Sequence, residues 1–364
     1  MINTCASEKR KLSPSIETGV VEATYSSSIM VNDHDEKDVF SPTSSNAING
    51  PFVDDIIFEI LHFLDSMFII QICMKISKQW RQVSFQKPLS LSFKQNHFKQ
   101  DGKSIKLFAD CECLKNLTSL DLYYNEIGIE GVKYIAESEW LKNLTYLNLS
   151  FNEIGSEGVK YIAASETLRN LTYLNLYRNR IDNEGVKYIS KSERLNNLTS
   201  LDLGWNRIGS EGGIHIATSE CLKNLTTLNL YDNRIGNRAV QYISSSEWLK
   251  NLTYLNLSFN EIGSEGVKYI ATSESLKNLT SLDLYHNIIG SDGAKYIATS
   301  EFLKNLTSLN LSSNGIGSEG VKNIAASETL KNLTNLDIYN NRFGREDVKY
   351  FATRECWKKT TIDC

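Results

Sequence analysis

A 27-residue unit repeats nine times from Leu114 to Cys356, with no insertion or deletion between copies. The second copy reads LKNLTYLNLSFNEIGSEGVKYIAASET, and the other copies are variations on it. A fixed period of this length predicts a solenoid, in which each unit packs only against its neighbours. A solenoid offers a long curved surface and no enclosed pocket. We therefore expect this chain to bind other molecules rather than to catalyse a reaction.

Each repeat combines a short strand with a short helix. In the first copy, Leu120 and Leu122 alternate with polar residues, which is the pattern of a strand with one buried face. The segment Gly131–Ala136 follows with helical spacing, and Val132 and Ile135 are predicted to face inward. Strands stack at about 4.8 Å, whereas helices need about 8–10 Å. The array should therefore curve, with a parallel sheet on its concave side and helices on its convex side.

Two polar positions of the repeat have predicted structural roles. In the second copy Ser156 is placed to cap the helix N-terminus. One asparagine follows the strand in every copy, and a short amide can bond the backbone groups left free where each strand turns away. This asparagine is found at Asn125, Asn152, Asn179, Asn206, Asn233, Asn260, Asn287, Asn314 and Asn341.

The repeat pattern, LxxLxLxxNxIGxEGxxYIA, resembles the leucine-rich repeat in the longer variety found in ribonuclease inhibitor. The resemblance covers about two thirds of the chain. It implies an α/β fold, a horseshoe-shaped solenoid with a parallel concave sheet and a helical convex side. Residues 87–113 look like a degenerate repeat, with Leu89 and Leu91 in a strand and Asn96 slightly ahead of the repeat asparagine. We predict that they cap the N-terminal end of the array, and that residues 357–364 form its C-terminal edge.

The chain before the array divides into two parts. Residues 1–50 are rich in Ser, Asp, Glu and Lys with few aromatic residues, a composition typical of disorder. Residues 51–86 are dense in apolar residues at helical spacing and predict a small all-α unit. The N-terminus has no apolar stretch after its charged residues, so it does not read as a secretory signal.

Composition excludes several classes of partner. The formal net charge of −4 gives no electrostatic case for nucleic acid, and no apolar run reaches the roughly 18 residues of a membrane span. Seven scattered cysteines fit neither a disulfide framework nor paired zinc spacing, so Cys111 and Cys113 are expected to be free and buried. We expect a cytoplasmic protein, with the nucleus left open. No catalytic residues, metal site, cofactor or small-molecule substrate is predicted, so the chain is not expected to be an enzyme.

Residues 52–82 resemble the F-box, the helical module that docks substrate receptors onto cullin–RING ubiquitin ligases. The matching stretches are DDIIFEILHFL from Asp54, FII from Phe68 and ISKQWR from Ile76. The sequence departs from the family pattern at Phe52-Val53, where Leu-Pro is usual, and at Asp65, where Pro is common. The resemblance implies that an aliphatic surface contacts the ligase adaptor, made by Ile56, Ile60, Leu61, Phe63, Leu64, Ile69 and Ile70.

The alternative interpretation of residues 51–86 is a simple N-terminal cap for the array. Residues 87–113 already supply a capping repeat, and a solenoid needs only one cap at each end. The F-box interpretation is therefore favoured.

The outward-facing strand positions should carry the function of the array. They hold an unbroken ladder of Asp and Asn and, two positions on, tyrosines that alternate with Ser or Gly. Aromatic side chains are typical binding anchors because they bring a large contact area at low entropy cost. The alternative is that the rings only pack sideways between neighbouring strands. The aromatic residues predicted to bind a partner are Tyr123, Tyr124, Phe151, Tyr177, Trp205, Tyr231, Phe259, Tyr285 and Tyr339.

A basic block lies beside these rings. Arg180, Arg207 and Arg234 follow the repeat asparagine in three adjacent repeats, and Arg178 adds to them. Their spacing of roughly 5 Å suits carboxylate or phosphate groups. The alternative is a solvated rim, in which the arginines pair with Asp232 and neighbouring acidic residues.

The leading functional hypothesis is a substrate receptor of a cullin–RING ubiquitin ligase. Its partners would be the ligase adaptor, at the F-box-like unit, and a target protein, on the concave face. The second hypothesis is a leucine-rich-repeat interaction scaffold with no ligase link. A third is a GTPase activator, but Arg178 and Arg180 lie on a regular repeat rather than in a distinctive loop, and fold analogy is weak support for function.

Overall fold

A computed structural model describes residues 57, 60, 64, 69, 74–76, 78–98, 102–352 and 357–364. All of them belong to one compact unit, Phe52–Cys364. Residues 1–50, which are predicted to be disordered, lie outside the described residues. Within the segment predicted to be helical, the structure has the helices α3 (Met74–Ile76) and α4 (Lys78–Ser84).

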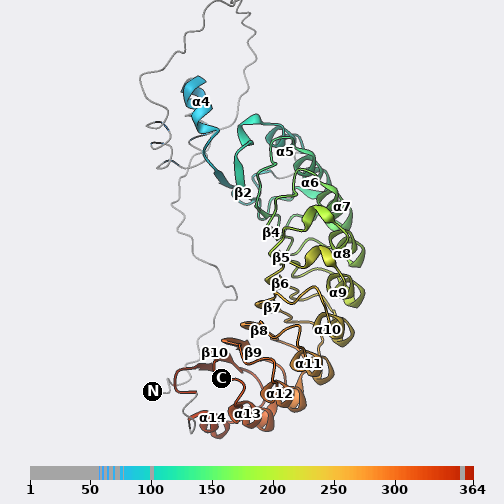
Figure 1. The fold of residues 1–364 in the computed structure, drawn as a ribbon, viewed down its shortest axis with the longest axis vertical. Coiled ribbons are helices and arrows are strands. Elements are labelled where there is room, and N and C mark those ends of the chain that lie inside the picture. The colour runs from blue at the N-terminus through green and yellow to red at the C-terminus, as the bar shows by residue number, and fades with distance from the viewer. Residues whose placement is uncertain are drawn as a thin grey trace, which may run out of the picture. The chain divides into compact units, whose positions relative to one another are not determined.

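The described strands form one parallel sheet in sequence order, from β1 to β11 (Figure 1). From β2 to β10, each paired strand residue lies opposite the residue one repeat further on, as Leu147 pairs with Leu174. This register follows directly from the constant length of the repeat. The strands are β1 (Leu89–Ser92), β2 (Leu117–Asp121), β3 (Tyr146–Asn148), β4 (Tyr173–Asn175), β5 (Ser200–Asp202), β6 (Thr227–Asn229), β7 (Tyr254–Asn256), β8 (Ser281–Asp283), β9 (Ser308–Asn310), β10 (Asn335–Asp337) and β11 (Thr361–Asp363).

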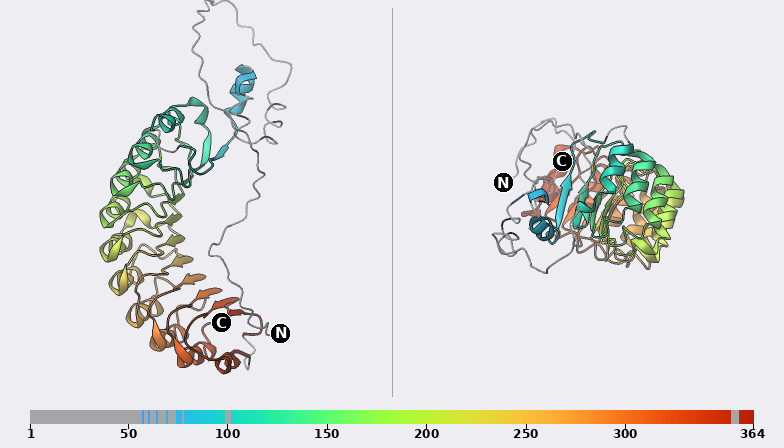
Figure 2. Two further views of the ribbon diagram at one scale, coloured as in Figure 1. Left: turned by 180° about the vertical axis from the view of Figure 1, so that it is seen from behind. Right: turned by 90° about the horizontal axis from the view of Figure 1, so that it is seen from above.

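A helix follows each strand from β1 to β10. Within the array the helices form the outer layer and the strands the inner layer of a curve, and both views in Figure 2 show the same two layers. The predicted curved, two-layered α/β solenoid is therefore confirmed. The helices are α5 (Gly102–Ala109), α6 (Gly128–Glu137), α7 (Gly155–Ala164), α8 (Asn183–Ser190), α9 (Gly209–Ala217), α10 (Gly236–Ser244), α11 (Ser264–Ala271), α12 (Gly290–Ala298), α13 (Gly317–Ala325) and α14 (Arg345–Ala352).

The core lies between the two layers and repeats from unit to unit. Leu120 and Leu122 from the strand side and Val132 and Ile135 from the helix side are all fully buried, as predicted. Burying such aliphatic side chains contributes roughly 1.5–3 kcal/mol each before the entropy cost of ordering them. No helix in the described ranges is long and apolar enough to span a bilayer.

The helices begin differently from the prediction. Helix α6 begins at Gly128 rather than Gly131, and the Gly128 amide donates a hydrogen bond to the carbonyl of Asn152 in the next repeat, at 3.0 Å. The predicted Ser156 cap is wrong, because Ser156 lies inside the first turn of α7 and its hydroxyl donates to the Asp182 carboxylate. At the start of α6, a backbone carbonyl of the neighbouring repeat thus accepts the hydrogen bond that was expected to go to a capping side chain.

The recurring asparagine forms a buried ladder, as predicted. The Asn179 Oδ1 accepts hydrogen bonds from the Asn152 and Ile154 amides at 3.0 and 3.3 Å. Its Nδ2 donates to the carbonyls of Leu149 and Tyr177 at 2.8 and 3.2 Å. The side chain therefore satisfies four backbone groups at the point where two strands end, and it is fully buried.

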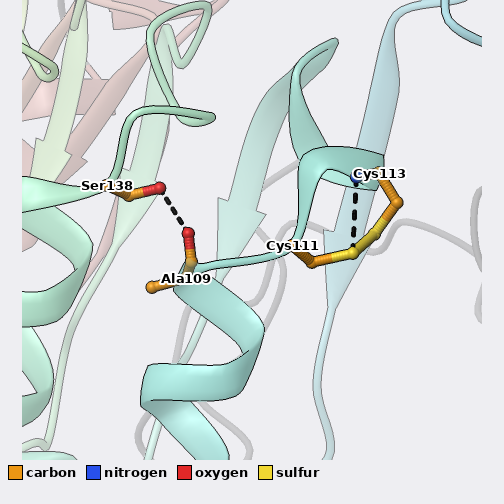
Figure 3. Close-up of a disulfide and its surroundings, with 4 residues drawn as sticks. All are labelled: Ala109, Cys111, Cys113 and Ser138. Carbon is orange, nitrogen blue, oxygen red and sulfur yellow. Dashed lines mark hydrogen bonds between the residues drawn. A yellow bond between two sulfur atoms is a disulfide. The ribbon is translucent and has the colours of Figure 1, made fainter.

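Two further ladders join the repeats elsewhere. The Ser138 hydroxyl donates to the Ala109 carbonyl (Figure 3), and serines one repeat apart continue this pattern. The Asn143 Nδ2, within an Asn-Leu-Thr triplet, donates to the Lys115 carbonyl, and the Thr145 hydroxyl of the same triplet donates to the Thr118 carbonyl. These polar side chains hold neighbouring repeats together.

Cys111 and Cys113 are joined by a disulfide, which corrects the expectation that they are free (Figure 3). The turn Glu112–Leu114 brings their Cα atoms to 5.2 Å, within the range that a disulfide bridges. The Cys113 amide also donates to the Cys111 sulfur at 3.3 Å.

The ends of the array are covered by incomplete repeats. At the N-terminal end, the Phe98 amide donates to the Asn125 Oδ1, so Phe98 stands where the ladder asparagine would be, rather than Asn96. At the C-terminal end, the Trp357 side chain is buried and its indole N–H donates to the Ala325 carbonyl at 2.9 Å. Strand β11 then pairs with β10.

We predict that Asn179→Ala lowers the free energy of unfolding by about 3–5 kcal/mol, because the Asn152 and Ile154 amides and the Leu149 carbonyl lose their partners. Asn143→Ala is the matched control, since Asn143 is an exposed ladder residue with one bond, and it should cost less than about 1 kcal/mol. Urea unfolding of the two variants measures both values. Equal losses would contradict the role of the buried ladder.

Candidate functional site

The Asp and Asn ladder on the concave face fixes the backbone. In each of the nine repeats the Oδ1 of this residue accepts a hydrogen bond from the amide two residues on, as Asp121 does from Tyr123 at 2.9 Å. This local bond shapes the turn that ends each strand. The ladder is therefore structural, and the recognition surface must be sought in the residues that follow it.

Most of the predicted aromatic residues meet in a continuous series of ring contacts, which we call the aromatic belt. Its rings lie 4.1–6.2 Å apart between centroids. The predicted Tyr339 makes no ring contact with another described residue, and its side chain is 62% exposed. The belt consists of Tyr123, Tyr124, Phe151, Tyr177, Trp205, Tyr231, Phe259, Tyr285 and His286.

The sideways packing is thus real, but it does not hide the belt. Trp205 remains 43% exposed and Tyr124 37% exposed, while the other predicted rings of the belt are partly buried. Exposed aromatic surface of this kind is typical of interaction sites.

Five belt residues have a left-handed backbone conformation, in which bulky side chains are disfavoured, and one of them is His286 with a φ of 54°. The φ angles of Tyr124, Phe151, Trp205 and Phe259 lie between 51° and 59°. This conformation costs roughly 1–2 kcal/mol for a residue other than Gly, Asn or Asp. The equivalent residue of the last repeat is Asn340, which suits a φ of 58°. The large rings are therefore not required by the backbone, and their presence calls for another reason.

One arginine is held inside the belt. The Arg178 guanidinium lies 4.9 Å from the Phe151 ring centroid and 4.3 Å from that of Trp205. Cation–π contacts of this kind contribute about 0.5–1 kcal/mol each at exposed sites. Arg178 is thus fixed between two rings.

The basic residues and three rings of the belt, Tyr124, Phe151 and Trp205, line one hollow of about 560 Å³. Arg180 pairs with Glu153 at 2.5 Å, as the solvated-rim alternative proposes. Arg207 and Arg234 have no carboxylate within 4 Å among the described residues. The acidic side chains of Glu126 and Asp232 also line the hollow. Of the predicted residues, the hollow therefore brings together Tyr124, Phe151, Arg178, Arg180, Trp205, Arg207 and Arg234. The predicted residues that do not line it are Tyr123, Tyr177, Tyr231, Phe259, Tyr285 and Tyr339.

A glycine on the concave face beside this hollow leaves space for a neighbouring ring. Gly204 stands where other repeats have Tyr or Ser, and a Cβ there would lie 2.7 Å from the Tyr177 ring. The gap lets Tyr177 lean over Gly204 and stack with Tyr231, two repeats further on, at 6.2 Å. No cluster of His, Cys, Asp or Glu that could hold a metal ion occurs in the part of the chain that the structure describes.

Comparison with known proteins decides the family. The leucine-rich-repeat family model matches eight segments, which together make up more than half of the chain: residues 113–136, 141–163, 167–190, 194–217, 221–244, 249–271, 275–298 and 302–325. The chain belongs to the leucine-rich-repeat family. No curated protein matches this leucine-rich-repeat chain.

Two solved structures are similar to this leucine-rich-repeat protein at low identity. One is TLR13 in a complex with ssRNA13, with 22% identity, a TM-score of 0.42, and coverage of 71% of this chain and 36% of TLR13. This chain therefore spans about a third of the length of TLR13. The other is the internalin InlF of Listeria monocytogenes, with 18% identity, a TM-score of 0.37, and coverage of 87% and 98%.

Sequence reasoning missed one aromatic pair of the leucine-rich-repeat sheet. Tyr146 and Tyr173 stack face to face, with ring centroids 4.3 Å apart and planes 11° apart. They occupy the first outward position of β3 and β4, and both copies read Thr-Tyr-Leu-Asn-Leu. Burial raises the pKa of both hydroxyl groups above the ordinary value of tyrosine. The tyrosine at the same position of two neighbouring repeats is the feature of the sequence from which this stacking could be predicted.

The predicted adaptor surface is described only in part. Ile56, Leu61, Phe63 and Ile70 lie outside the described residues. Ile60 is 38% exposed and Leu64 is partly buried. Ile69 is fully buried, and this corrects its assignment to a surface, because a side chain without exposed area packs in the core.

Asp202 is the ladder carboxylate next to Gly204, and burial raises its pKa to about 6. As the pH rises from about 4 to 6, the Asp202 carboxyl group loses its proton in the unfolded chain before it does so in the folded chain. The ionised Asp202 therefore lowers the free energy of unfolding above this range. We predict that Asp202→Asn raises the free energy of unfolding by about 1–2 kcal/mol at pH 7.5 and by much less at pH 4. Asn already occupies this position at Asn175 and Asn229. An equal gain at both pH values, measured by urea unfolding, would contradict this account.

Proposed function

We propose that this leucine-rich-repeat protein recognises another protein through its concave face and delivers it to a cullin–RING ubiquitin ligase. The observation that carries the first part is the aromatic belt, in which four large rings occupy left-handed positions that the last two repeats fill with the small polar residues Ser313 and Asn340. Rings that are partly exposed at a cost in backbone energy are best explained by a partner that covers them.

The second part of the proposal rests on the F-box resemblance of residues 52–82. Ile60 belongs to the aliphatic set that the resemblance assigns to the adaptor, and it is exposed. In this role the protein performs no chemistry. It acts as a tether, which raises the effective concentration of the target near the ligase. A cytoplasmic location is part of the proposal.

One observation favours the alternative, an interaction scaffold with no ligase link. Cys111 and Cys113 form a disulfide, and disulfides are rare where cytosolic reductants keep thiols reduced. The alternative keeps the concave recognition surface and assigns residues 51–86 to capping the array.

Photo-crosslinking tests recognition by the concave face. We predict that p-benzoylphenylalanine at position 205 captures a discrete protein adduct in the cells that express this protein. The matched control is position 242, because Tyr242 on helix α10 is 40% exposed, close to the 43% of Trp205. Equal adducts from the two positions, or none from position 205, would count against the concave face.

A pull-down with the purified ligase adaptor tests the ligase link. We predict that the full chain binds the adaptor and that Ile60→Arg weakens this binding at least about tenfold, since a charge would be buried in an apolar contact. Ile76→Arg is the control, because Ile76 is 56% exposed on α3 and outside the predicted adaptor surface. If the unmodified chain does not bind, the scaffold alternative stands. If both variants bind equally well, the predicted surface is wrong.

A further inference from the structure

We propose that the hollow around Arg178, Arg207 and Arg234 binds the acidic side chains of an extended segment of the partner protein. The inference rests on the proposed recognition role of the concave face and adds the chemistry of what is recognised. The occupant is a peptide segment with at least two Asp or Glu residues and an apolar side chain beside them.

The first argument is the number of unused donors in the hollow. A guanidinium carries five N–H donors. No hydrogen bond or ion pair within the described part of the chain uses the side chains of Arg178, Arg207 or Arg234. Other arginines of the array do find carboxylates, as Arg194 and Arg238 do at 2.5 and 2.6 Å. The three unpaired guanidiniums outnumber the carboxylates of Glu126 and Asp232 in the same hollow.

Second, the fold does not require an arginine at position 178 or 207. Four repeats further along the array, the positions of Arg178, Trp205 and Arg207 hold His286, Ser313 and Gly315. The position of Phe151, by contrast, again holds a phenylalanine, Phe259. The position of Arg234 also holds an arginine again, Arg342. For Arg178 and Arg207 the same backbone is therefore built with and without the basic residue, and their combination with Arg234 occurs in one part of the concave face.

The third argument is preorganisation. Because Arg178 is fixed between the Phe151 and Trp205 rings, it loses little side-chain entropy when it binds an anion. The exposed Trp205 ring also offers an apolar contact beside the charge. A carboxylate met by a guanidinium can form two parallel hydrogen bonds.

The geometry favours an extended segment. Arg207 and Arg234 follow neighbouring strands, which lie about 4.8 Å apart. Side chains two residues apart in an extended peptide point to the same side and lie about 7 Å apart. Long arginine side chains on neighbouring repeats can reach two such carboxylates at once. The proposed occupant of the hollow is therefore an extended segment with acidic residues at alternate positions.

Fluorine NMR of the full chain labelled with 5-fluorotryptophan tests the proposal, with the Trp205 signal assigned from Trp205→Phe. The probe is a synthetic peptide with Glu at alternate positions around a central Leu, and its control has Gln in place of every Glu. We expect the acidic peptide to shift the Trp205 signal and the control peptide to leave it unchanged. The double variant Arg207→Gln and Arg234→Gln should lower the affinity for the acidic peptide at least about fivefold. Arg238→Gln, which changes an arginine outside the hollow, should leave this affinity unchanged.

Three results would overturn the inference: no shift of the Trp205 signal at millimolar acidic peptide, unchanged binding by the double variant, or tighter binding of a single-stranded oligonucleotide of equal charge. The crosslinking experiment separates this inference from the proposed function. If position 205 captures a protein but the acidic peptide does not bind, only the acidic chemistry is wrong. If the peptide binds at Trp205 but no protein is captured there, the hollow binds acidic chains and the proposed function fails.

Discussion

The buried asparagine ladder is the interaction on which the rest of the structure depends. Each asparagine amide bonds backbone groups on both sides of the point where a strand ends, as Asn179 does for the Asn152 amide and the Leu149 carbonyl. A backbone group buried without a partner would cost about 1–3 kcal/mol. An inserted or deleted residue would break these bonds in two repeats at once, so the constant 27-residue period has a direct physical reason.

The ladders leave part of the concave face free for function. Leucines fill the core, the buried asparagine closes the strands, and the Asp and Asn ladder shapes the turns. The residues just beyond, such as Phe151, Arg178 and Trp205, carry none of these tasks. They can change from repeat to repeat, and the contrast between Arg178 and its counterpart His286 shows that they have done so within one chain.

The sequence predicted the features that depend on a residue and its own repeat. The strand leucines, the inward Val132 and Ile135 and the structural asparagine follow from local pattern and polarity. Features that depend on a neighbour 27 residues away could not be predicted in the same way. The carbonyl of Asn152 caps α6, and the rings of Phe151 and Trp205 enclose Arg178, because separate repeats meet in space. The Cys111–Cys113 disulfide and the burial of Ile69 likewise depend on local geometry that spacing alone does not give.

The large rings of the belt serve recognition rather than folding. The most direct measurement is the free energy of unfolding of a variant in which Tyr124, Phe151, Trp205 and Phe259 are all changed to Asn. Relief of the left-handed backbone, at about 1–2 kcal/mol for each of the four residues, should offset most of the eight ring contacts that they make, at about 0.5–1.5 kcal/mol each. We predict a value within about 2 kcal/mol of the parent chain. A loss of more than about 5 kcal/mol would show that the rings hold the array together, and would contradict the claim.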